Sequence, residues 1–179
     1  MKHLVRTIAM VVLLSPMALS AQFEKFEKSD KIGSVTINKG MMGIVASMSA
    51  DDKNKEAREF IELAKSINEI KVFISEDAKA SADMTTTAKR YIKKSSLESL
   101  MKVKEGNSRI DFYIKNGKND NYVSELLMLV SGMDKKGKGT GFETVLVTMQ
   151  GTIDLTKVGS LVNKMNLPKD LKKASKKSK

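Results

Sequence analysis

Two apolar runs, residues 122–131 and 142–150, constrain the fold most strongly, and they flank a polar loop rich in glycine and lysine. This pattern predicts a β-hairpin at the centre of a sheet. The two runs form the most hydrophobic part of the chain after residue 21. We therefore expect the other elements to pack around this hairpin.

The first 21 residues have the three parts of a secretory signal peptide. Lys2 and Arg6 supply a positive start, residues 8–14 form a short apolar stretch, and residues 18–21 read Ala-Leu-Ser-Ala. The apolar stretch is too short to span a bilayer, which takes roughly 20 residues. We expect cleavage near Ala21 and export to the periplasm, with secretion or association with the envelope as further destinations. A retained signal anchor is the competing interpretation.

The remaining chain has the length of one domain, which we place at residues 22–167, followed by a lysine-rich tail at 168–179 that we expect to be disordered. It contains no cysteine, so its core alone must hold it together without disulfides. It also contains no second apolar segment of spanning length. The formal charge of +11 falls to +9 without Lys2 and Arg6, and the tail supplies +5 of it.

The pattern upstream of the hairpin alternates between strand and helix. Phe23 and Phe26 suggest an amphipathic lead-in that docks on the body. In the helix expected at 39–48, the apolar face would consist of Met41, Ile44, Val45 and Met48. The other expected elements are strands at 32–37 and 69–75, a helix at 53–68 capped by Asp51 and Asp52, and a helix at 78–94 capped by Glu76 and Asp77.

From Leu97 the apolar period changes to two, which predicts four successive strands at 97–104, 109–115, 122–131 and 142–150. Consecutive strands with short links pair antiparallel. Asp154 would cap a last helix at 155–165, which ends before Pro168. The fold class is therefore α+β: a mainly antiparallel sheet of about six strands, including a C-terminal four-strand meander, with helices packed on one face.

The strongest chemical constraint is an absence. His3 is the only histidine and leaves with the signal peptide, so the mature chain has neither histidine nor cysteine. Histidine-based triads and the usual zinc, copper and haem sites are thereby excluded. We expect no cofactor and no enzymatic activity.

Two motif look-alikes fail on their context. Residues 132–138 match the start of a phosphate-binding P-loop, but Gly139 stands where Ser or Thr should bind magnesium, and a strand follows instead of a helix. Ser99 and Lys102 have the Ser-x-x-Lys spacing of penicillin-recognising enzymes, which place the pair on a helix. Here the stretch alternates like a strand, so the two side chains are expected to point to opposite faces.

Carboxylates and methionines offer the remaining side-chain chemistry. Acid–base catalysis by two carboxylates stays open, with Asp111, Glu125 and Glu143 expected on the solvent face and Asp154 expected as a helix cap. Nine methionines remain after processing, and three of them lie in residues 39–48. Methionine clusters bind copper(I), but the helical spacing favours core filling.

The lysine tail has an alternative role at an anionic surface. Lysines near a charged membrane attract anionic lipid or lipopolysaccharide by up to about 1 kcal/mol each. A solvated tail that aids solubility is the plainer interpretation, because the lysines lack interleaved apolar residues and are screened by salt. Nucleic acid is not expected, since the tail has no stacking aromatic residues. The residues proposed for contact with an anionic surface are Lys172, Lys173, Lys176 and Lys177.

Residues 125–132 and 145–155 resemble a family of exported Bacteroidetes proteins grouped as domain of unknown function 4252. Residues 70–73, 100–103 and 110–113 also look like strands of that family. The resemblance implies an envelope-facing α+β domain of a Gram-negative bacterium. The members of the family that this chain resembles include many that look like lipoproteins and some that are encoded near extracytoplasmic sigma factors. This chain lacks the lipobox cysteine, and the family supplies no catalytic residues to carry over.

Three functions therefore remain in view. The first is a non-enzymatic periplasmic or secreted module that binds an envelope protein or surface ligand, linked to envelope stress signalling. The second is a peripheral binder of anionic lipid or glycan that uses the basic tail, and the third is a carboxylate-based hydrolase.

Overall fold

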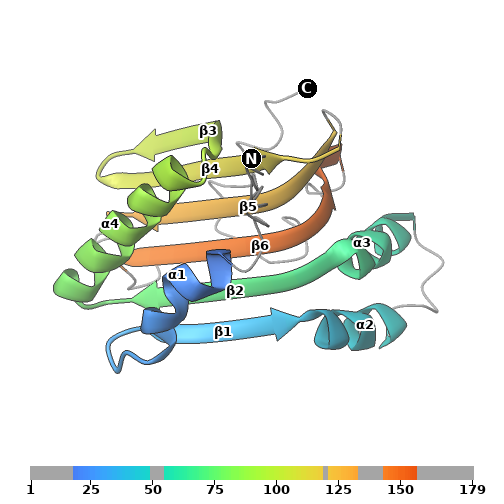
Figure 1. Cartoon of the computed structure of the whole chain (residues 1–179), viewed down its shortest axis with the longest axis horizontal. Helices are drawn as coiled ribbons and strands as arrows, with labels where there is room; N and C mark the ends of the chain where they lie inside the picture. The colour runs from blue at the N-terminus through green and yellow to red at the C-terminus, as the bar shows by residue number, and fades with distance from the viewer. Residues whose placement is uncertain (1–17, 49–54, 119–120, 133–142, 157–179) are drawn as a thin grey trace, which may run out of the picture.

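The computed structural model describes residues 18–48, 55–118, 121–132 and 143–156 (Figure 1). These residues form six strands and four helices. The strands are β1 (Gly33–Asn38), β2 (Ile67–Ser75), β3 (Glu98–Glu105), β4 (Ser108–Asn116), β5 (Tyr122–Ser131) and β6 (Thr144–Asp154). The helices are α1 (Ala18–Glu27), α2 (Lys39–Met48), α3 (Lys55–Ser66) and α4 (Ala78–Lys94).

All strands join one antiparallel sheet in the order β1-β2-β6-β5-β4-β3. The α+β class, the six-stranded sheet and the meander from β3 to β6 are therefore confirmed. The hairpin of β5 and β6 lies at the centre, with Leu127 opposite Thr148 and Leu129 opposite Leu146. β2 pairs with the free side of β6, and β1 forms the edge beyond it (Figure 1).

Each face of the sheet has its own hydrophobic cluster. On one face, α1 and α4 lie across the strands and bury residues such as Phe73, Leu127 and Leu146 (Figure 1). The alternate strand residues point to the other face, where they pack with buried residues of α2 and α3. We expected the helices on one face of the sheet. Helices α1 and α4 lie on one face together, whereas α2 and α3 pack against residues of the other. We call the first face the α1/α4 face and the second the aliphatic face.

The amphipathic lead-in docks as expected. Phe23 and Phe26 of α1 are fully buried, and their ring centroids lie 6.1 and 5.5 Å from that of Phe73 on β2. The ring of Phe23 also lies 5.3 Å from that of Tyr91 on α4. Cleavage at Ala21 would leave both buried phenylalanines in the mature chain.

Helix α2 differs from its predicted orientation. It buries Met42 and Ala46, whereas Met41 is 50% exposed and Ile44 is exposed as well. The Asn38 side chain accepts a hydrogen bond from the backbone N–H of Met41 at 3.1 Å, which fixes the start of the helix directly after β1. From that start, the residues that reach α3 and β2 are Met42 and Ala46. The predicted stripe was wrong at Met41 and Ile44, whereas Val45 is half-buried and the side chain of Met48 is not described. Because α2 is apolar on both sides, periodicity could not select one.

Two predicted caps lie at helix starts. The Asp77 carboxylate accepts a hydrogen bond from the N–H of Ala80 at 2.8 Å and begins α4. The Asp154 carboxylate accepts one from the N–H of Thr156 at 2.9 Å, at the point where the backbone turns helical. The rest of the expected helix at 155–165 lies outside the described residues, as do the expected caps Asp51 and Asp52.

Candidate functional site

Buried polar groups mark the α1/α4 face. Every buried polar or charged residue among those the structure describes belongs to this face, either from the sheet or from α4. The buried residues that line the aliphatic face in the same part of the chain are apolar. Burying a polar group costs free energy unless it is hydrogen-bonded. The eight residues are Lys71, Ser75, Ser81, Thr87, Asp111, Glu125, Thr144 and Thr148.

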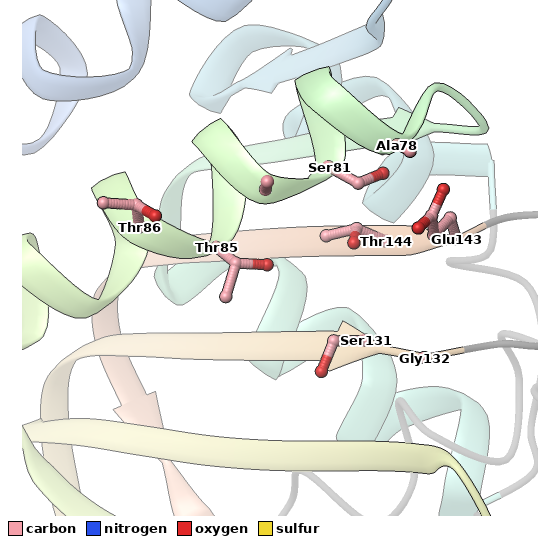
Figure 2. Close-up of a pocket in the computed structure, with 9 residues that line it drawn as sticks. Ala78, Ser81, Thr85, Thr86, Ser131, Gly132, Glu143 and Thr144 are labelled. Atoms are coloured by element: carbon pink, nitrogen blue, oxygen red, sulfur yellow. The ribbon is translucent and has the colours of Figure 1, made fainter.

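The same face carries an open pocket of about 310 Å³ between the first half of α4 and the sheet. Figure 2 shows Ser81 and Thr85 of α4 bordering the hollow together with Ser131 and Thr144 of the strands. Ser131 ends β5 and stands opposite Thr144, which begins β6. Besides Glu143, the other lining residues are Ala78, Ala82, Thr86 and Gly132.

Local hydrogen bonds fix the sheet side of the pocket. The N–H of Gly132 donates to the carbonyl of Glu143 at 3.1 Å, and the N–H of Glu143 donates to the carbonyl of Ser75 at 3.0 Å. These bonds hold the end of β5, the start of β6 and the end of β2 together. On the helix side, Ser81 is buried and its hydroxyl donates to the Ser75 carbonyl at 3.5 Å.

Gly132 has a structural reason to be glycine. Its φ is +74°, and a Cβ added there would overlap the backbone oxygen of Asn107. Only glycine adopts this conformation and close approach without strain. The P-loop look-alike therefore begins with a turn residue. A P-loop must be followed by a helix, whereas the described chain after this loop is strand β6, so residues 132–138 do not form a P-loop.

The pocket presents hydrogen-bonding groups with little charge. Five of the nine lining side chains carry a hydroxyl, which both donates and accepts hydrogen bonds. Glu143 is the one titratable side chain in the lining, and aromatic residues are not part of it. Such a surface suits a neutral polar ligand held by hydrogen bonds. It lacks a second carboxylate, which acid–base hydrolysis by a carboxylate pair needs.

The other three carboxylates considered above lie apart from this pocket. Asp111 and Glu125 were expected on the solvent face, but they are only 3% and 5% exposed. The prediction was wrong because both residues project from the sheet beneath the α1/α4 layer, as their register opposite Leu129 and Lys115 shows. Asp154 is the cap described above.

Glu125 is held by a hydrogen bond from α4. The hydroxyl of Tyr91 donates to Oε2 at 2.9 Å, whereas Oε1 has no hydrogen-bond partner among the described residues. Burial raises the pKa of Glu125, and the Tyr91 hydrogen bond and the charge of Lys115 oppose that rise. Burial likewise raises the pKa of Tyr91. The hydrogen bond between Tyr91 and Glu125 therefore connects α4 to β5.

Asp111 accepts a hydrogen bond from Nε of Arg109 on the same strand at 2.7 Å, and this contact raises the pKa of Arg109. The second carboxylate oxygen, Oδ1, has no hydrogen-bond partner among the described residues. Arg109 stands opposite Ser131, at the pocket end of the sheet. The ion pair is therefore a neighbour of the pocket, although neither residue lines it.

A third buried charge ties α1 to the sheet. Nζ of Lys71 lies 2.7 Å from Oε1 of Glu27 and 4.0 Å from Oε1 of Glu69. Lys71 is buried on β2, opposite Thr148 of β6. The ion pair holds the end of α1 over β2.

The Ser99–Lys102 pair lies on strand β3, as the alternation predicted, but not on opposite faces. A register shift between Ser99 and Met101 places Ser99 opposite Tyr113 and Lys102 opposite Asp111, two residues of the same face. The β-bulge changes the alternation by one residue, which the sequence pattern could not reveal. Both residues are exposed on the edge strand.

The remaining candidates have simple outcomes. Lys172, Lys173, Lys176 and Lys177 lie outside the described residues. Of the clustered methionines, Met42 is in the core and Met41 is exposed. Within the described ranges, acidic side chains form no group of three that could hold a metal ion. No helix in those ranges is long and apolar enough to cross a membrane.

The pocket could not be found from a sequence motif. Its hydroxyls come from α4, the end of β5 and the start of β6, and single serines and threonines carry no signal at such separations.

A comparison with protein families matches residues 26–161 to the model described as domain of unknown function DUF4252. The chain matches no curated protein and no solved structure.

Proposed function

The chain belongs to the DUF4252 family, and we propose that this member is an exported, non-enzymatic binding module for a small neutral polar ligand. The proposed site is the pocket between α4 and the ends of β5 and β6. The observation that carries the proposal is that five hydroxyl-bearing residues and a single carboxylate line one open hollow. Small-molecule sites combine a concave surface with a few placed polar groups.

Export is supported by the sequence of the first 21 residues and by the packing directly after them. Cleavage near Ala21 would keep Phe23 and Phe26, which anchor α1, and Glu27, which pairs with buried Lys71. A cut only a few residues later would remove part of the core. The proposed location is the periplasm or the cell envelope, where ligand binding would feed an envelope stress response.

The non-enzymatic part of the proposal is supported by the chemistry of the lining. Glu143 has no second carboxylate beside it in the pocket, and the mature chain offers no histidine or cysteine to act as base or nucleophile. Hydroxyls hold a ligand but do not activate water at neutral pH without such a partner. A bound ligand would therefore be released without chemical change.

Binding can be tested with N,N′-diacetylchitobiose, a neutral probe that carries both hydroxyl and amide groups. We expect the protein to bind the probe in a calorimetric titration and Thr144→Val to weaken binding by about fivefold, because one hydrogen bond is worth about 1 kcal/mol. Thr152→Val is the matched control, since Thr152 is exposed and lies on the same strand away from the pocket. Equal affinities of the two variants would contradict the proposed site.

The lysine tail supports a second candidate function, attraction of the protein to anionic surfaces. Residues 169–179 contain six lysines and one aspartate, enough for attraction that salt should weaken. Co-sedimentation with phosphatidylglycerol vesicles should then depend on residues 169–179 and fall as salt is raised. Sedimentation that survives removal of the tail would eliminate this function.

A further inference from the structure

The two edge strands of the sheet differ in how they are protected. β3 carries Glu98, Lys102, Lys104 and Glu105 and contains a bulge, which are the usual defences against pairing with another strand. β1 reads Gly-Ser-Val-Thr-Ile-Asn, has no charge, and pairs with β2 in an unbroken register. An unprotected edge offers its free backbone N–H and C=O groups to another strand.

β1 is also exposed to an unusual degree. Five of its six residues are exposed, among them Val35 at 53%. Val35 and Ile37 stand opposite Val72 and Ile70, so both belong to the aliphatic face of the sheet. Helix α2 follows β1 directly and leaves Met41 and Ile44 exposed. The edge of the sheet thus carries an apolar surface next to unpaired backbone groups.

We propose that β1 pairs antiparallel with β1 of a second copy of this chain, so that two sheets join into one across a twofold axis. A second copy fits this edge because β1 is self-complementary: Val35 and Ile37 flank Thr36 on the same face, and the strand carries no charge. The chain after residue 21 carries a formal charge of +9, and two like-charged chains approach each other at least cost where their surfaces are uncharged. Residues 33–38 and the adjoining α2 after Lys39 form such a surface.

The twofold symmetry also selects a register. In an antiparallel pair, opposite residues share a face, so a residue on the axis must face its own copy. With the axis at Thr36, Val35 lies opposite the partner's Ile37, and two pairs of β-branched side chains cover each other on the aliphatic face. With the axis at Val35, Lys39 would lie opposite the partner's Lys31. The Thr36 register avoids that repulsion and is the one proposed.

The chain contains no cysteine, so single introduced cysteines report the register directly. Opposite Cα atoms in an antiparallel pair are about 4.5–5.5 Å apart, within the range that a disulfide spans. Under mild oxidation, Thr36→Cys should form a covalent dimer. Val35→Cys should cross-link poorly with itself but well with Ile37→Cys. Leu100→Cys, 47% exposed on the other edge strand, should form no covalent dimer, because the two copies of β3 lie far apart in the proposed dimer.

Light scattering on the unmodified protein gives the second test. We expect twice the monomer mass, which Val35→Lys should reduce to the monomer mass with an unchanged circular dichroism spectrum. Leu100→Lys is the matched control and should remain dimeric. A monomeric wild-type protein, a dimer that tolerates Val35→Lys, or cross-linking through Leu100→Cys would each overturn the proposal. A cross-link between Thr36→Cys and an unrelated chain, in place of the covalent dimer, would also overturn it.

Discussion

The two faces of the sheet are built from alternate residues of the same strands but from different chemistry. On the α1/α4 face, the helices bury eight polar or charged residues, whereas the buried described residues of the aliphatic face are apolar. Adjacent positions illustrate the difference: Val147 belongs to the aliphatic cluster and Thr148 lies buried on the other face. One strand therefore contributes apolar side chains to one face of the sheet and polar side chains to the other.

The two faces differ in how burial contributes to stability. The aliphatic face gains free energy from burial alone, at roughly 25 cal/mol per Å² of apolar area. The α1/α4 face gives up part of that gain by burying charges, two of which leave a carboxylate oxygen without a hydrogen-bond partner among the described residues. The same face holds the hydroxyl-lined pocket. Of the eight buried polar residues, Ser81 and Thr144 line that pocket, and the proposed function gives these two a role in holding a ligand.

The largest expected effect comes from placing the same charge on each face. Val147→Asp buries a carboxylate among aliphatic side chains and should destabilise the fold by about 3–5 kcal/mol. Thr148→Asp should cost clearly less, because Thr148 stands opposite Lys71. Urea unfolding followed by circular dichroism measures both. Equal losses for the two variants would remove the distinction between the faces.

The next effect concerns the ion pair beneath α1. Glu27→Ala removes the acid that lies 2.7 Å from buried Lys71 and should cost about 1–3 kcal/mol, because the ammonium group stays buried. Adding Lys71→Met to Glu27→Ala should restore most of the lost stability. The free energies of unfolding of the single and double variants decide this. A double variant that is less stable than the single one would show that the charge itself is needed.

A smaller effect is expected from pH. Burial raises the pKa of Glu125 in the folded state above its value in the unfolded chain, so the folded state binds the proton more tightly. The wild type should then lose stability as pH rises from the unfolded pKa through the folded pKa. Glu125→Gln keeps an acceptor for the Tyr91 hydroxyl and should lack this loss. The stability gained by Glu125→Gln should therefore grow as pH rises above about 4.3, where a glutamate in the unfolded chain titrates, each pKa unit of difference being worth about 1.4 kcal/mol.

Urea unfolding of both proteins across this pH range provides the measurement, with Glu143→Gln as the control because Glu143 is only half-buried at the pocket. If the difference in free energy of unfolding between wild type and Glu125→Gln did not change with pH, it would contradict the raised pKa of Glu125 in the folded state.

The smallest expected effect on stability is that of the pocket hydroxyls. Ser131→Ala and Thr85→Val should each change the free energy of unfolding by less than about 1 kcal/mol, because both side chains are only partly buried. Each should nevertheless weaken binding of the chitobiose probe. A large loss of stability without any loss of binding would identify these residues as core residues only.

The sequence allowed the sheet to be predicted because strand periodicity and turn residues are local signals. The hairpin of residues 122–131 and 142–150, the capping by Asp77 and the docking of Phe23 could be predicted for that reason. The strand order β1-β2-β6 could not be predicted, because it depends on which distant strand meets the free side of β6.

The site was harder to predict for the same physical reason. Asp111 and Glu125 sit in alternating strands where the charge suggests a solvent face, yet both are buried, and Tyr91 of α4 contacts Glu125. The orientation of α2 was ambiguous because apolar residues surround its axis, and the bulge in β3 altered the alternation after Ser99. Pocket hydroxyls from Ser81 to Thr144 become neighbours only through tertiary packing.

Methyl NMR of the protein with and without excess chitobiose tests the central claim most directly, because methyl groups of adjacent residues report opposite faces. Thr85 and Thr144 line the pocket, whereas Val145 and Val147 pack on the aliphatic face. We predict that the threonine signals shift on titration with a common affinity and that the valine signals move little. Shifts confined to the valines, or no shift on either face, would contradict a binding site on the polar face.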